Sequence, residues 1–96
     1  MSYRLTPVDS EQEKRVLTGL IISTKFCRDA IPILKAEHLE IEYGRTVLRW
    51  VKIYYDEYRK APGIHVQDLF EEQRPRMREE VAGLVGGFLA DLSEKY

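Results

Sequence analysis

The sequence predicts an all-α protein, a compact orthogonal bundle of five to six helices, because its apolar residues recur at helical spacing. One such series, with gaps of one, three and four, is Tyr43, Val47, Trp50, Val51, Tyr54 and Tyr58. A second, near the C-terminus, is Met77, Val81, Leu84, Val85, Phe88 and Leu92. A helix face that carries Trp and several Tyr needs other helices packed over it. We therefore expect several packed helices and no sheet.

The chain has 96 residues, enough for one domain near the lower end of what folds alone. We expect a lead-in over residues 1–8, a helical domain over residues 9–93 and a tail over residues 94–96. The apolar fraction of 44% is ordinary for a globular protein and argues against disorder.

The first helix is expected to start at a cap formed by Asp9 or Ser10 and to run to about Ile22. Its buried residues are predicted to be Val16, Leu17, Leu20 and Ile21, with Glu13 and Lys14 turned outward. Gly19 lowers helix stability by up to about 1 kcal/mol relative to alanine. A close approach of another helix would explain that glycine.

Ser23 and Thr24 are expected to begin a second, shorter helix, which Pro32 kinks or ends near Ile31. Its predicted inner face consists of Phe26, Ala30, Ile33 and Leu34. Residues 35–40 then form a turn or a single helical turn, with Leu39 and Ile41 pointing inward.

The longest helix is expected from about Glu42 to Lys60, and residues 61–63, Ala-Pro-Gly, stop it. A fourth helix follows from about His65 to Glu72, with Val66, Leu69 and Phe70 inward. Pro75 fits the first position of a last helix, which runs to about Ser93. The pair Gly86-Gly87 is able to divide that helix into two pieces.

Charge and cysteine content narrow the function classes. Fifteen basic residues nearly balance sixteen acidic ones, so the strongly basic character of a dedicated nucleic-acid binder is absent.

Cys27 is the single cysteine and forms no internal disulfide; we expect a partly buried, inert thiol. No apolar stretch is long enough to span a bilayer and no secretory signal is visible, so we expect a cytoplasmic protein.

The residue inventory gives no sign of catalysis. There is no Gly-x-x-x-x-Gly-Lys-Ser/Thr loop, so we expect no ATP binding of that class. With two histidines, His38 and His65, and one cysteine, a metal site is not expected. The acidic pairs, among them Glu71 with Glu72, fall on predicted outer faces. We expect no enzyme activity, no cofactor and no metal.

The candidate partner-binding residues lie on the polar side of the longest predicted helix. They are Arg45, Arg49, Lys52, Tyr55 and Arg59. The first three are spaced to share one face and would suit an acidic protein surface or a DNA backbone; the alternative is a solvated face with ion pairs along the helix. Tyr55, beside Arg59, is either an interface anchor or a half-buried rim residue.

Two blocks of the sequence resemble the N-terminal domain of DnaB-family replicative DNA helicases. Residues 13–22, EKRVLTGLII, are similar to the opening helix of that domain, with matches at Glu13, Val16, Leu17, Leu20, Ile21 and Ile22. Residues 33–58 resemble its leucine-lysine-proline-glutamate segment and long helix, with matches at Ile33, Leu34, Lys35, Glu37, Leu39, Arg45, Leu48 and Tyr55. Residues 66–72 and 86–89 are similar to later parts. Departures from the pattern are Thr18 for glycine, Ala36 for proline and Gly44 for histidine, and Ala90 and Asp91 replace the usual Tyr-Leu.

The resemblance implies a non-catalytic helical domain that supports assembly of the helicase ring and docks primase or a loader. The ATPase motor of that family lies in a separate domain, which this sequence does not include, so we expect a fragment or a free-standing relative. Expected partners are primase, helicase protomers or a loader, with a possible homo-oligomer. A small helical nucleic-acid-binding domain is the alternative, with direct nucleic-acid binding expected to be weak or absent. A small enzyme or metal protein is the third hypothesis.

Overall fold

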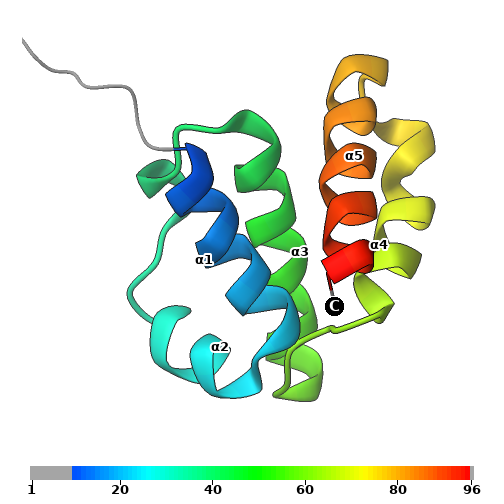
Figure 1. Cartoon of the computed structure of the whole chain (residues 1–96). Coiled ribbons are helices and arrows are strands. Elements are labelled where there is room, and N and C mark those ends of the chain that lie inside the picture. Colours follow the sequence, from blue (N-terminus) through cyan, green and yellow to red (C-terminus); the bar gives the residue numbers. More distant parts are fainter. Residues whose placement is uncertain (1–9, 96) are drawn as a thin grey trace, which may run out of the picture.

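A central helix, α3 (Glu42–Tyr58), organises the fold in the computed structural model, which describes residues 10–95. Helix α1 (Ser10–Ile22) packs on one side of α3, and α2 (Thr24–Ala30) packs against α1. Helices α4 (His65–Gln73) and α5 (Glu79–Lys95) contact α3 from the other side (Figure 1). Two short 3₁₀ turns, η1 (Ala36–His38) and η2 (Arg74–Arg76), complete the described elements. The all-α prediction is confirmed, since residues 10–95 contain five α-helices and no strand.

Helix α1 buries Leu17, Leu20 and Ile21 as predicted, but the outward orientation predicted for Glu13 is wrong. Glu13 is buried, and its two carboxylate oxygens accept hydrogen bonds from the backbone N–H groups of Glu40 (3.0 Å) and Ile41 (3.2 Å). It lies one turn before Leu17, on the same face. The N–H groups of the partly buried segment before α3 need acceptors, and Glu13 supplies them. The proposed cap at Asp9 lies outside the described residues.

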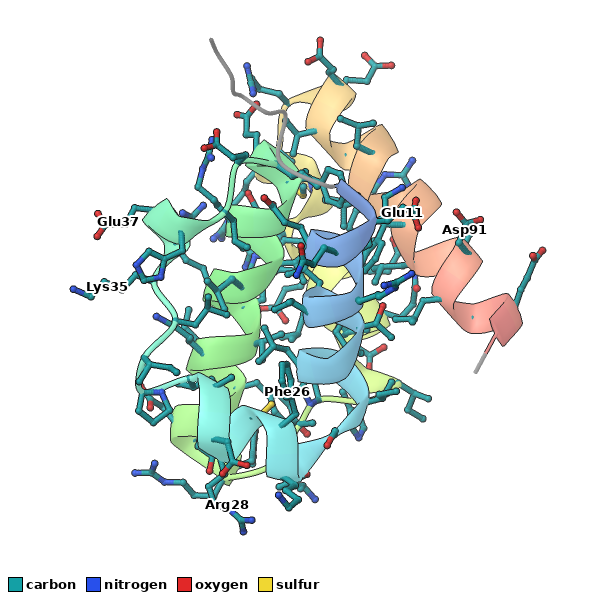
Figure 2. The ribbon with its side chains drawn as sticks, turned by 60° about the vertical axis from the view of Figure 1, so that its left-hand side comes forward. Glu11, Phe26, Arg28, Lys35, Glu37 and Asp91 are labelled. Atoms are coloured by element: carbon teal, nitrogen blue, oxygen red, sulfur yellow. The ribbon has the colours of Figure 1, made fainter. Side chains whose placement is uncertain are left out.

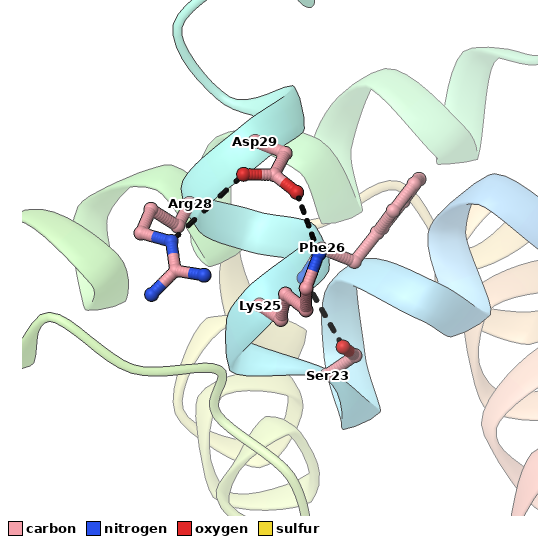
Figure 3. Close-up of polar contacts among 5 residues, drawn as sticks. All are labelled: Ser23, Lys25, Phe26, Arg28 and Asp29. Atoms are coloured by element: carbon pink, nitrogen blue, oxygen red, sulfur yellow. Dashed lines mark hydrogen bonds and ion pairs between the residues drawn. The ribbon is translucent and has the colours of Figure 1, made fainter.

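The junction between α1 and α2 is a close contact, as Gly19 suggested. A Cβ atom at Gly19 would lie 2.8 Å from Cδ2 of Phe26, which belongs to α2 (Figure 2). Ser23 caps α2 by accepting a hydrogen bond from the Phe26 N–H, at 3.1 Å (Figure 3). The glycine therefore gives the aromatic ring room to pack against the backbone of α1.

Helix α2 ends at Ala30, ahead of Pro32, close to the predicted position. Ile33, predicted to point inward, is 74% exposed, because residues 31–33 form a turn and helical spacing no longer applies there. The single helical turn expected next is η1. Lys35 and Glu37 project away from the body of the molecule (Figure 2), whereas Leu39 is buried as predicted.

Helix α3 buries the first four residues of its predicted stripe, Tyr43, Val47, Trp50 and Val51. Tyr54 is half-buried, and the burial predicted for Tyr58 is wrong, since that residue is 53% exposed. Leu48 is fully buried and Tyr55 packs against the core. The buried arc is thus wider than one stripe, because α3 is covered from two sides.

The C-terminal end of α3 is set by its capping residue. The helix stops at Tyr58, two residues before the predicted end, and Arg59 adopts the left-handed conformation with φ +56°. Pro62 is fully buried and the Gly63 N–H donates to the Ile21 carbonyl at 2.7 Å. The connection to α4 is therefore fixed against the end of α1.

Helix α4 contributes Val66 and Phe70 to the core, and α5 contributes Val81, Val85, Phe88 and Leu92, of which Phe88 packs on Tyr43 of α3. Pro75 does not start the last helix as predicted: it lies in η2, and the extended backbone of Met77 separates that turn from α5. Helix α5 then continues unbroken through Gly86-Gly87 and beyond Ser93. Leu84 is exposed, contrary to prediction, because α5 lies at the edge of the bundle and is covered on one side only.

Candidate interaction surface

Arg45, the first of the five candidate residues, is engaged within the chain. Its Nη1 donates to the carbonyl of Leu39 at 2.7 Å and to that of Glu40 at 3.3 Å. These bonds hold the segment before α3 against the first turns of the helix. The guanidinium therefore has a structural role that the sequence pattern did not indicate.

Tyr55 and Arg59 come together near the end of α3. The Arg59 guanidinium carbon lies 5.8 Å from the centroid of the Tyr55 ring, within cation–π range. Tyr55 is half-buried against the core, and Lys52 is half-buried one turn earlier. This places Tyr55 as a rim residue of the core, the second of the two roles considered for it.

Arg49 lines a groove between α3 and the segment that runs from α4 through η2 to the start of α5; we call it the α3–α4 groove. Two adjoining hollows, of about 370 and 630 Å³, make it up, and both are lined by Trp50, Ile53 and Gln73. The first hollow is completed by Glu42, Thr46, Arg49, Arg76, Met77, Arg78 and Val81. The second is completed by Tyr54, Glu57, Tyr58, Lys60, His65, Asp68, Leu69 and Glu72.

The two halves of the α3–α4 groove carry opposite charge. Three arginines and one glutamate line the first hollow, and Glu42 forms an ion pair with Arg78. Three carboxylates and one lysine line the second. Within residues 10–95, neither Arg49 nor Arg76 has a salt-bridge partner. Each half therefore has an excess of two formal charges, positive at one end and negative at the other.

The centre of the groove is apolar and open. Ile53 is 65% exposed, although it lies on a helix whose other aliphatic residues are buried. Trp50, which is buried, lines both hollows with Ile53, and Tyr54, whose ring stacks on that of His65 with centroids 6.1 Å apart, lines the second. Sequence reasoning missed Ile53. The sequence does contain a sign of it: Ile53 is an apolar residue on a helix face whose residues four positions before and after it, Arg49 and Glu57, are charged.

The fold raises the pKa of Cys27 and that of Tyr43. Cys27 is fully buried, more than predicted, and its thiol donates to the Leu20 carbonyl at 2.9 Å. Burial raises the pKa of Cys27. Burial also raises the pKa of Tyr43, with smaller contributions from Glu11, Glu13 and Asp91. A neutral, enclosed thiol is a poor nucleophile, as the sequence suggested.

The remaining polar residues do not gather into a metal site. No group of three or more potential ligands occurs in the described part of the chain. His65 lies at the start of α4, as predicted, with its Nδ1 3.6 Å from Asp68, whereas His38 accepts a hydrogen bond from the Lys35 N–H at 3.1 Å. None of the helices within residues 10–95 is both long and apolar enough to cross a bilayer.

Comparison with known proteins yielded no relative. The sequence matches no protein-family model, and no significant match was found among curated proteins or among solved structures.

Proposed function

We propose that this chain is a non-catalytic protein-interaction domain that acts in DNA replication, like the N-terminal domain of a DnaB-family replicative helicase. In that role it supports ring assembly and docks primase or a loader in the cytoplasm. The sequence blocks at residues 13–22 and 33–58 support the family assignment. The α3–α4 groove supports the mode of action, which is docking of another protein.

The observation that carries the proposal is the exposed Ile53 at the centre of a charged groove. Protein interfaces combine an apolar centre, which loses water on binding, with a polar rim that selects the partner. Ile53 and Trp50, which line both hollows, supply the centre, and Arg49 and Glu57 belong to the rim. When an apolar side chain of a partner covers Ile53, apolar surface is removed from water, and this contributes favourably to the binding free energy.

Calorimetric titration against primase and against the helicase motor encoded in the same genome tests the proposal. We expect binding to at least one of them, weakened at least about tenfold by Ile53→Asp because a buried carboxylate must then lose its hydration. Ile33→Asp is the matched control, since Ile33 is also an exposed isoleucine but lies after α2, outside the groove. Equal effects of the two substitutions would remove the groove from the docking surface.

Binding of nucleic acid through the basic residues of α3 is the competing function. The carbonyl bonds of Arg45 leave Arg49 and Lys52 as the remaining members of that row. Phosphate contacts make affinity fall steeply with salt. Fluorescence anisotropy with labelled single- and double-stranded DNA therefore separates the two hypotheses: strong, salt-sensitive DNA binding without affinity for the replication proteins would overturn our proposal.

A further inference from the structure

Three residues on the exposed side of α3 form a symmetric series. Arg49, Ile53 and Glu57 are spaced by four, so they lie on one face of the helix, each about 6 Å from the next along its axis. The series reads basic, apolar, acidic, and Ile53 is its midpoint. Rotating such a series by half a turn about its midpoint brings the arginine to the place of the glutamate.

The opposite wall of the groove repeats this polarity. Trp50 pairs with Phe70, with ring centroids 6.4 Å apart, and Tyr54 pairs with His65, so α4 runs antiparallel to α3. Asp68, in the first turn of α4, consequently lies beside the end of α3 that carries Glu57, and Glu72, in the last turn of α4, lines the same hollow. Arg76, which follows α4, lies beside Arg49. Both walls are basic at the same end.

We infer, on the premise of the proposed role in protein contact, that the α3–α4 groove binds a second copy of this chain. The two copies meet about a twofold axis that passes close to Ile53, with their α3 helices antiparallel. Arg49 of each copy then faces Glu57 of the other, and the two Ile53 side chains cover each other. Such an isologous contact closes at two subunits.

The distribution of charge favours a second copy over other occupants. A nucleic acid would meet repulsion at the half that contains Glu57, Asp68 and Glu72, and an acidic peptide would meet the same repulsion. The surface complementary to a groove with one basic and one acidic end has the reverse order of charges. The groove itself has that order after the twofold rotation.

Sedimentation equilibrium of the purified chain and of two charge-reversal variants tests the arrangement. We expect the unmodified chain to dimerise weakly, with a dissociation constant of about 10–100 µM at low salt, as for a small and transient interface. Arg49→Glu alone and Glu57→Arg alone each bring like charges face to face, so each should raise that constant at least about tenfold. In an equimolar mixture of the two variants, the substituted side chain of one faces the substituted side chain of the other with opposite charge. The mixture should therefore form a heterodimer as tight as the original homodimer.

Arg28→Glu is the matched control, because it reverses an exposed charge on α2 (Figure 2) at a residue that lines neither hollow of the groove. It should dimerise like the unmodified chain, and circular dichroism should show that all variants are folded. A chain that stays monomeric to about 1 mM at low salt, or a mixture that stays monomeric, would overturn the inference. Binding to primase or to the motor is measured separately, so its presence or absence distinguishes failure of this inference from failure of the proposed function.

Discussion

Removing the buried carboxylate of Glu13 should destabilise the domain far more than its helical position suggests. Glu13 accepts hydrogen bonds from the N–H groups of Glu40 and Ile41, so Glu13→Ala leaves two partly buried donors without acceptors. Each unsatisfied buried donor costs about 1–3 kcal/mol. Because Glu40 is exposed and water can reach its N–H, we expect a combined loss of about 2–3 kcal/mol in the free energy of unfolding.

Urea titration followed by the fluorescence of Trp50, the single tryptophan, measures this loss. A destabilisation of that size lowers Tm by about 10–20 °C in a domain of this length. Glu13→Gln keeps one acceptor oxygen but points an amide donor at the other N–H, so it should lose about half as much. Gln12→Ala, at an exposed neighbouring position, is the control and should change stability by less than about 0.5 kcal/mol. If Glu13→Ala and Gln12→Ala lose the same amount, the two hydrogen bonds do not stabilise the fold.

Three further substitutions, one pH series and one alkylation experiment are informative. Gly19→Ala forces a Cβ against Phe26 and should destabilise the domain by about 1–2 kcal/mol. Gly83→Ala, with no atom within 4 Å of the new Cβ, should stabilise the domain by about 0.5–1 kcal/mol. Equal shifts of the urea unfolding transition in the two variants would contradict the close contact at Gly19. The folded state raises the pKa of Cys27 above its ordinary 9.0 and that of Tyr43 above 10.0, so their contribution is complete below those values and is lost as pH rises through the folded-state pKa. The free energy of unfolding should therefore fall above about pH 9, and that of the Cys27→Ala variant should fall less steeply. A free energy of unfolding that stays constant up to about pH 11 would refute this. Alkylation of native Cys27 should be at least about 100-fold slower than in urea.

The identity and order of the helices followed from local signals in the sequence. Ser23 and Pro32 mark the boundaries that they were predicted to mark, since a cap or a proline acts within one turn of the chain, whereas α3 ends at Tyr58, two residues before the end predicted from residues 61–63. Pro75 was misassigned because its preference for a first helical turn is satisfied equally by a short 3₁₀ turn. Local signals do not distinguish these two outcomes.

Errors in burial arose where a residue's environment is set by distant parts of the chain. Glu13 is buried because backbone donors from residues 40 and 41 need it, a requirement invisible in its own helix. Tyr58 is exposed because it is the last residue of α3, where its ring packs on that of Tyr54 at the surface, although helical spacing put it on the inner face. Patterns of polarity predict which face is inward only when one side of a helix is covered.

The candidate surface was predicted in part. Arg49 was identified from the spacing of basic residues and does line the groove. Arg76 and Glu72 could not be connected with it, because they reach the same groove only after α4 folds back along α3. Arg45 matched the basic spacing equally well, yet its guanidinium binds backbone carbonyls, and spacing alone carries no information about such bonds.

The position of α3 between two sets of helices bears on how the domain loses its structure. If α1 with α2, or α4 with α5, detaches, one flank of α3 is left in water, and its buried aliphatic and aromatic side chains lose their contacts. Neither half is therefore a stable partner for α3 by itself. Unfolding should be cooperative, with the slowest amide exchange in the middle of α3 and faster exchange in α2 at the periphery.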